Sequence, residues 1–379
     1  MDFSLTEEQT LIQDMARSFA DAELAPHTAM WDEEKFLDRT VFEKAAELGF
    51  CGIYTGEDHG GTALSRLDSA IVFEQLAAGD VSHTAMLTIH NMATWMIDRY
   101  ADKYLREKYV PQLTSGRMIA SYCLTEPGAG SDAASLSTKA KRDDDEYVLN
   151  GTKSFISGAG WSDIYVVMAR TSDDGAKGIS TFVVEKGTAG LSFGATEKKM
   201  GWNAQPTAQV IFEECRIPAS NRVGAEGDGF KFAMSGLDGG RVNIGACSLG
   251  GAQKALAATL DYTRERRQFG KSLADFQNTQ FMLADMATEL EASRLMLYRA
   301  ADMLDKQLPN AGAACAMAKR FATDLCSKIA DDALQLHGGY GYLKDYEIEQ
   351  IVRDLRVHQI LEGTNQVMRM IVSRNLLRQ

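Results

Sequence analysis

A single acidic residue stands where the last predicted helix begins, in the stretch ILEGTNQVMRM at residues 360–370. Glu362 comes just before Gly363, and Thr364 and Asn365 are residue types that cap helices. The apolar residues that follow recur at helical spacing. A carboxylate in a largely apolar loop can have its pKa raised by desolvation, which suits a general base at neutral pH. The alternative is that Glu362 only favours the positive end of a helix.

Two stretches in the middle of the chain could surround a flat or anionic ligand. Residues 122–131 read YCLTEPGAGS, a loop whose backbone N–H groups can turn toward an anion or a ring. The loop lacks the Gly-Lys-Ser/Thr of a Walker A motif and the G-x-G-x-x-G of a Rossmann fingerprint. Phe155, Ile156 and Ser157 end a predicted strand with an aromatic ring and a hydroxyl. A tight inter-domain turn and an ordinary strand end are the alternatives.

Three helical stretches carry arginines or glycines. YTRERRQFG at 262–270 ends a predicted helix, where a guanidinium could grip a pyrophosphate or only stabilise the helix end. The glycines of QLHGG at 335–339 could let a ligand approach the backbone or could stop the helix. LDGGR at 237–241 is predicted to open a helix, with Asp238 as its cap and Arg241 available to a charged or thioester-bearing ligand.

Composition limits the classes of function. The chain has 379 residues, a net charge of −12 and 24% charged residues, which argues against nucleic acid and an anionic membrane surface as partners. No apolar run approaches the roughly 18 residues of a membrane span. The six cysteines form no CxxC pair, so we expect reduced thiols and no metal site. The first residues show no signal or transit pattern, which favours the cytoplasm of a bacterium, or the mitochondrial matrix for a trimmed eukaryotic enzyme.

The hydrophobic patterns predict an α+β chain of three domains. Residues 1–120 read as an N-terminal all-helical domain, with helices near 39–49, 66–78, 83–98 and 102–114. Residues 121–231 read as a middle domain of antiparallel strands, with a hairpin turn at Asn150-Gly151. Around Gly229 the helical period returns, and the long helices of residues 232–379 predict a C-terminal four-helix bundle.

Taken together and in this order, the motifs resemble those of the acyl-CoA dehydrogenase family. The resemblance runs from about Asp2 to Leu377, and it is carried by YCLTEPGAGSD, FISGAG, RRQFG, LQLHGGYGY and LEGTNQ. Within the family, the stretches SRLD, TIHNMATWMID, EKKMGWNAQPT and GGYGYLKDY look most like the members that act on isobutyryl-CoA. Phe155 stands where many members have tryptophan, and the isobutyryl-type members share the phenylalanine.

The resemblance implies a homotetramer with one FAD per subunit, held between the β domain and the C-terminal helices and partly by a neighbour. The residues implied to line the flavin ring are Tyr122, Cys123, Leu124, Thr125, Glu126, Pro127, Gly128, Ala129, Gly130, Ser131, Phe155, Ile156 and Ser157. Those implied to bind the dinucleotide half are Arg266, Phe276, Gln277, Gln335, Leu336, His337, Gly338 and Gly339, with Thr364, Asn365 and Gln366 from the side of Glu362. The acyl-CoA would contact Ser131, Asp238, Gly239, Gly240, Arg241 and Arg374.

The chemistry implied by the resemblance is α,β-dehydrogenation. Glu362 would take the α-proton while the flavin accepts the β-hydride, and the Glu362 N–H and a flavin hydroxyl would hold the thioester carbonyl. Some members place the base in the segment matching LDGGR, but here Gly239 and Gly240 leave Glu362 as the base. The expected reaction is isobutyryl-CoA to methacrylyl-CoA in valine degradation, with electrons passed to an electron-transfer flavoprotein. 2-Methylbutyryl-CoA and butyryl-CoA remain as alternative substrates, and a flavin oxidase as an alternative enzyme.

Overall fold

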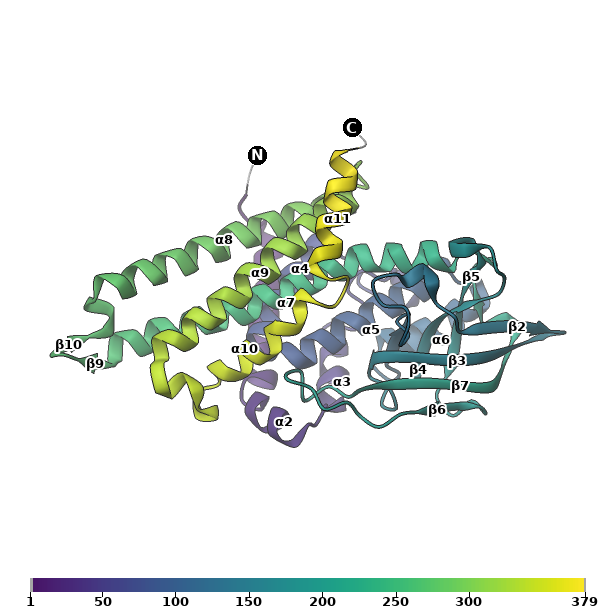
Figure 1. Cartoon of the computed structure of the whole chain (residues 1–379), viewed down its shortest axis with the longest axis horizontal. Coiled ribbons are helices and arrows are strands. Elements are labelled where there is room, and N and C mark those ends of the chain that lie inside the picture. The colour runs from purple at the N-terminus through teal and green to yellow at the C-terminus, as the bar shows by residue number, and fades with distance from the viewer. Residues whose placement is uncertain (1–2, 378–379) are drawn as a thin grey trace.

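Helices make up the first part of the chain in the computed structural model, which describes residues 3–377 (Figure 1). Thr6 and Gln9 form the reciprocal capping box that their spacing predicts at the start of the first helix. The fourth and fifth helices are buried almost throughout, so they form the centre of this part. The helices are α1 Glu7–Phe19, α2 Thr28–Glu34, α3 Arg39–Glu47, α4 Arg66–Gly79, α5 Val81–Tyr100 and α6 Lys103–Thr114.

An eight-stranded sheet follows, with the strand order β6-β7-β3-β2-β4-β5-β8 and β1 beside β4. Most neighbours are antiparallel as expected, but β1 and β2 both pair with β4 in parallel, so the sheet is mixed. β1 arrives from α6 and leaves into the glycine-rich loop, and no hairpin forces it to reverse against its neighbour. The strands are β1 Ala120–Cys123, β2 Lys139–Asp143, β3 Glu146–Ser157, β4 Ile164–Arg170, β5 Ile179–Glu185, β6 Leu191–Phe193, β7 Thr207–Pro218 and β8 Arg222–Val223.

The hairpin turn predicted at Asn150-Gly151 is wrong. Both residues lie inside β3, and the chain turns instead at Asp144 (φ +51°), between β2 and β3. Gly151 has φ +147° at a bulge opposite β7, where an added Cβ would lie 2.7 Å from the Thr138 Cα. The glycine therefore serves a bulge and a close backbone approach, which a sequence pattern can confuse with a turn.

Long helices return at Gly229, where α7 begins, as expected. α7, α8 and α9 run side by side, α4 packs against α7 and α8, and the shorter α10 and α11 pack on α9. The sheet lies at one end of this helical body and a small β9–β10 hairpin at the other (Figure 1). The bounds are α7 Gly229–Glu265, β9 Arg267–Gln268, β10 Lys271–Ser272, α8 Gln277–Asp305, α9 Ala311–His337, α10 Ile348–Arg356 and α11 Asn365–Leu376.

One apolar cluster joins the sheet to the helices. Side chains of α5, α6 and the start of α7 cover one face of the sheet, including Met96, Val110 and Phe232 against Val166. The opposite face has an aromatic cluster of its own. Because α5 and α7 pack on both the helical body and the sheet, the end of β1 and the loop before α11 line one cavity. Within residues 3–377, no helix has the length and apolarity needed to cross a bilayer.

Candidate active site

Glu362 lies on a tight loop between a short 3-10 turn and α11, as the sequence predicts. Its backbone is left-handed (φ +53°), and Gly363 continues the turn at φ +87°. The Thr364 hydroxyl then accepts a hydrogen bond from the Val367 N–H at 3.2 Å and caps α11. The loop thus presents the carboxylate on its inner side.

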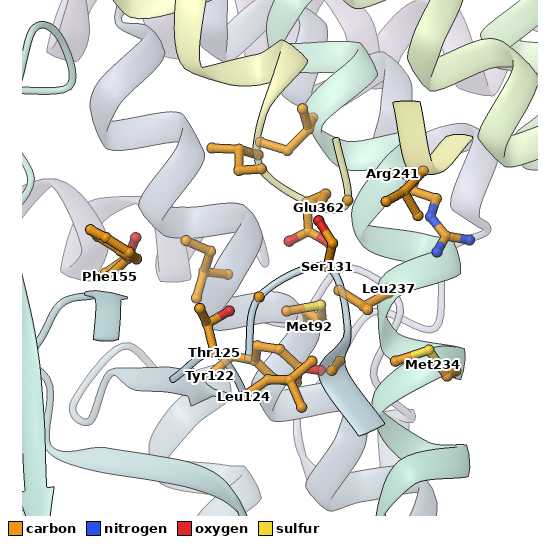
Figure 2. A pocket seen from close by; sticks show the side chains of 18 of the residues that line it. Met92, Tyr122, Leu124, Thr125, Ser131, Phe155, Met234, Leu237, Arg241 and Glu362 are labelled. Carbon is orange, nitrogen blue, oxygen red and sulfur yellow. The ribbon is translucent and has the colours of Figure 1, made fainter. Parts of the chain in front are cut away.

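A cavity of ≈ 380 Å³ lies in front of this loop. In Figure 2 the Glu362 side chain points into it toward Ser131 and Met92, with Phe155 and Arg241 on opposite sides. The walls are mostly apolar and come from α5, the loop after β1, the end of β3, α7 and the loop before α11. The predicted residues at this cavity are Tyr122, Leu124, Thr125, Gly130, Ser131, Phe155, Ile156, Ser157, Arg241 and Glu362.

The surroundings of Glu362 raise its proton affinity. The Oε2 atom is shielded from solvent and has no hydrogen-bond partner within the described part of the chain. Desolvation raises the pKa of Glu362 to about 7, although the positive charges of Arg241 and Lys319 oppose the rise. A carboxyl that titrates near neutral pH can both accept and hold a proton there.

The prediction that LDGGR opens a helix is wrong, because α7 begins at Gly229 and passes through it without a break. Asp238 caps nothing, and its carboxylate instead accepts a hydrogen bond from the Arg241 guanidinium. An added Cβ at Gly239 would lie 2.5 Å from Arg66, and one at Gly240 would lie 2.4 Å from the Glu362 Oε2. The glycines are therefore contact points in mid-helix, and Gly240 is what lets the carboxylate reach the wall.

Sequence reasoning missed the apolar part of this wall. Residues of α7 spaced by four and three positions face the cavity together with two from α5, which is a signal that the sequence does carry. This spacing was overlooked because the start of a helix was placed at residue 237, in the middle of the pattern. The missed residues are Phe230, Met234, Leu237 and Ile244, which share the helical spacing of the predicted Arg241, joined by Ile89 and Met92.

The glycine-rich loop reaches the cavity with only part of its predicted set. Glu126 turns away, and its carboxylate accepts hydrogen bonds from the Ser137 and Thr138 N–H groups and from the buried Lys153 ammonium at 2.8 Å. Cys123 and Ala129 are buried, and Pro127 and Gly128 are exposed on the outer side of the loop. The Glu126–Lys153 pair therefore fixes the loop to β3, and the cavity sees the other residues.

The end of β3 is strained in a way that exposes an aromatic ring. A bulge separates Lys153 from Ile156, and Phe155 between them has φ +58° with 68% of its surface exposed. Ser157 beside it accepts a hydrogen bond from the Gln205 amide at 2.8 Å. Trp202, on the same loop as Gln205, also lines the cavity, and neither was predicted.

Some of the residues predicted to bind the dinucleotide half line a second cavity of ≈ 390 Å³ far from the first. Tyr262 stacks on His337 at 4.3 Å between ring centroids, and the Arg266 guanidinium lies 5.1 Å from the Tyr340 ring centroid. His337 ends α9, while Lys319 of the same helix contacts the Glu362 loop, and the intervening turns span roughly 27 Å. Leu336, Gly338 and Gly339 line this cavity, whereas Phe276, Gln277 and Gln335 do not.

A third cavity of ≈ 340 Å³ continues from the first toward the surface. Arg241 and Ile371 line both, and Asp238 and Arg374 line only the outer one. Ser131 lies at the inner cavity, so four of the predicted substrate residues follow one path from the surface to Glu362, whereas Gly239 and Gly240 line neither cavity.

The residues after Glu362 hold the loop itself. Thr364 is the cap already described, Asn365 is buried against α9, and Gln366 is exposed. The loop is therefore bound to α9 on the side of Asn365, and the side that carries Gln366 faces solvent in a single chain.

Comparisons with known proteins identify the family. The acyl-CoA dehydrogenase N-terminal, middle and C-terminal domains match residues 6–117, 121–215 and 227–377. This chain belongs to the acyl-CoA dehydrogenase family. It is 57% identical over 373 residues to the mitochondrial isobutyryl-CoA dehydrogenase of Dictyostelium discoideum, covering 98% of this chain and 90% of the relative. It is 56% identical to the one of Bos taurus, with 99% and 90% covered.

The fold agrees with this family. A solved structure of butyryl-CoA dehydrogenase from Megasphaera elsdenii superposes with a TM-score of 0.97 at 37% identity, covering all of both chains. The predicted three-part arrangement of helices, sheet and helices is therefore confirmed. The predicted domain boundaries stay a prediction, although the sheet begins at Ala120 and α7 at Gly229.

The enzyme is an FAD-dependent oxidoreductase, as its family is. The residues of the first cavity suit a flat ring with polar edges. Phe155 presents an exposed face, Ser157 offers a hydroxyl, and the buried indole N–H of Trp202 has no partner among residues 3–377. A Cβ added at Gly130 would meet nothing within 4 Å, so the loop leaves room there.

Proposed function

We propose that this enzyme converts a short branched acyl-CoA, isobutyryl-CoA, to methacrylyl-CoA. The observation that carries the proposal is the shielded, unpartnered Glu362 carboxylate in a largely apolar cavity. The 56–57% identity with isobutyryl-CoA dehydrogenases supports the choice of acyl group. The same relation supports valine degradation as the pathway.

Glu362 acts as the general base at the carbon next to the thioester. Its carboxylate Oε2 accepts the α-proton and becomes a neutral carboxylic acid, which the apolar walls favour over the charged form. Within residues 3–377, no backbone carbonyl accepts a hydrogen bond from the Glu362 N–H. That N–H is therefore available to the thioester carbonyl, whose negative charge grows as the proton leaves.

FAD, when bound, supplies the acceptor for the hydride that leaves the β-carbon. Phe155, Ser157 and Thr125 would hold it in the first cavity. Met92, Met234 and Leu237 exclude water from the reacting carbons, because their apolar side chains form the wall opposite the base. Arg241 and Arg374 bring positive charge to the outer path, where the anionic CoA would lie.

A substrate panel tests the choice of acyl group. Isobutyryl-, 2-methylbutyryl-, butyryl- and isovaleryl-CoA would be compared at equal FAD loading with an artificial electron acceptor. We expect the highest kcat/KM with isobutyryl-CoA. A clear preference for butyryl-CoA or 2-methylbutyryl-CoA would replace the proposal by those alternatives, and no oxidation of any of the four would refute it.

We also propose that electrons leave to an electron-transfer flavoprotein and not to oxygen. Peroxide formed in air per acyl-CoA oxidised separates the two fates. A dehydrogenase gives very little, whereas stoichiometric peroxide would indicate an oxidase on the same scaffold.

We further propose a homotetramer in which the second cavity completes a neighbour's FAD site. In one chain the flavin residues and the Arg266–Gly339 group lie at opposite ends of the helical body, which supports a shared site. Light scattering should give four times the chain mass of 41.5 kDa. A monomer that retains FAD would contradict this arrangement.

A further inference from the structure

A buried lysine of α9 lies directly behind the base. Lys319 has no exposed surface, and its ammonium donates hydrogen bonds to the Gly363 carbonyl at 2.8 Å and to the Asn365 Oδ1 at 3.0 Å. Gly363 is the residue after Glu362, so this contact fixes the left-handed turn from inside the protein. Lys319 does not line the cavity, and it is not among the site residues predicted from the sequence.

The other end of the loop is bound to the same helix. The Asp324 carboxylate accepts hydrogen bonds from the Gln359 amide at 3.0 Å and from the Asn365 amide at 2.7 Å. Gln359 precedes Glu362 and Asn365 follows it, so the loop is held on both flanks. The base is thus placed by α9, although it belongs to the segment before α11.

The lysine also interacts with the base through its charge. Burial lowers the pKa of Lys319 to about 8, and the nearby negative charge of Glu362 opposes this fall. In return the Lys319 charge lowers the pKa of Glu362 against the larger effect of desolvation. Arg241 and Asp324 are the other charged groups that act on Lys319.

We propose that Lys319 is a positioning residue for the base: it holds the Glu362 loop in its left-handed turn, and its charge favours the carboxylate form of Glu362. The proposal rests on Glu362 being the base of the proposed reaction. A purely structural lysine would satisfy the Gly363 carbonyl without affecting how Glu362 titrates. The two roles differ in what they predict for pH dependence.

Three variants separate position from charge. Lys319→Met removes both the donor and the charge, Lys319→Gln keeps a donor without the charge, and Lys319→Arg keeps both in a larger side chain. Lys328→Met is the matched control, because Lys328 lies on the same helix but is half exposed and, among residues 3–377, forms ion pairs only with Glu289 and Asp332. Each variant would be prepared as the FAD-loaded full chain.

The first measurement is the pH profile of kcat/KM. Without the positive charge, the acidic limb moves to higher pH in Lys319→Met and Lys319→Gln, and activity at pH 7 falls at least threefold relative to the plateau. Lys319→Arg restores the limb toward that of the wild type, and Lys328→Met leaves it unchanged. An unmoved limb in folded Lys319→Gln would overturn the charge role, whether or not Lys319→Met folds.

The second measurement is made on the same FAD-loaded chains and needs no substrate. Amide hydrogen exchange of the peptide covering residues 360–366 should be faster in Lys319→Met than in the wild type, with Lys319→Gln in between. Exchange equal to the wild type in both variants would overturn the positioning role. Because this arm is independent of turnover, it decides the role of Lys319 even if none of the acyl-CoA substrates is oxidised.

Discussion

The cavity beside Glu362 and the cavity beside His337 have almost the same volume, but the surrounding chain encloses the first more fully than the second. Around Glu362, segments from the sheet, α5, α7 and the loop before α11 shield the carboxylate, and Gly240 touches it from the wall. Around His337, the lining comes from the end of α7, the segment after it, the end of α9 and the turn that follows α9. A Cβ added at Gly338 or Gly339 would meet nothing within 4 Å.

This difference fits the roles proposed for the two regions. A base with a raised pKa needs desolvation from several sides, which one chain supplies by folding. A grip on an anionic cofactor needs only a few charges and exposed rings, and these can be offered to a neighbouring molecule. Phe269 and Tyr342 near the second cavity are 93% and 80% exposed, so this end of the molecule is left open in one chain.

The largest effect on turnover is expected from a substitution in the enclosed cavity beside Glu362. Glu362→Gln keeps the shape of the side chain but removes the base, so turnover should fall by roughly 10²–10⁴-fold. FAD content and acyl-CoA binding should stay near those of the wild type, because the amide adds no bulk to the cavity. Rapid-mixing reduction of the loaded enzyme measures the loss, and near-normal reduction would place the base elsewhere.

Closing the gap at the wall should displace the base without removing it. In Gly240→Ala the new Cβ would lie 2.4 Å from the Glu362 Oε2, so the carboxylate must shift, and we expect turnover to drop on the order of 10²-fold. The helix itself should gain stability from alanine. Gly339→Ala in the open cavity is the control, with turnover at saturating FAD unchanged. Equal behaviour of the two variants would mean that the cavities do not differ as described.

The titration of the base gives a smaller effect with a definite sign. With a pKa of about 7, the fraction of Glu362 that is ionised, and with it kcat/KM, rises about tenfold from pH 6 to pH 8. A raised pKa also means that the folded chain binds this proton more tightly than the unfolded one. Its contribution to stability is therefore present below the usual carboxyl pKa and is lost as pH rises through 7.

Thermal melts check the second half of this prediction. The melting temperature of the wild type minus that of Glu362→Gln should fall between pH 5 and pH 8. A flat difference, together with a pH-independent kcat/KM, would show that Glu362 does not titrate in this range.

The sequence predicted the order of helices, sheet and helices because periodicity changes sharply near residues 120 and 229. It also predicted the Glu362 loop, since Gly363 and Thr364 are local signals. It failed where a glycine serves a distant contact. Gly151 was predicted to form a turn and Gly239-Gly240 to start a helix. These glycines are instead required by close contacts with Thr138, Arg66 and Glu362, which lie too far away in the sequence for a local pattern to show.

The same limit applies to the candidate site. Glu126 belongs to the predicted loop, but its side chain pairs with Lys153, 27 positions away, and so leaves the cavity. Trp202 lines the cavity, and Gln205, buried on the same loop, donates a hydrogen bond to Ser157, although neither was predicted as a site residue. The prediction thus wrongly included or missed residues whose positions depend on long-range packing. It correctly included Glu362, whose position depends on its own local turn.

A substitution in the open cavity beside His337 is expected to have the smallest effect on turnover. Arg266→Ala removes a guanidinium that is stacked over Tyr340, and we expect FAD affinity to fall by up to about tenfold. At saturating FAD, turnover and the acidic limb of kcat/KM should match the wild type, because the Glu362 loop contacts α9 at Lys319, roughly 27 Å along the helix from His337. Equilibrium dialysis of FAD and light scattering measure affinity and assembly together.

Arg264→Ala is the matched control for this variant, because Arg264 lies two residues earlier and is exposed, with only Asp261 as its ionic partner. If both variants retain FAD equally, the second cavity does not hold the cofactor. If Arg266→Ala instead moves the acidic limb, the two regions are coupled, and the division between a base enclosed by one chain and a cofactor grip shared between chains does not hold.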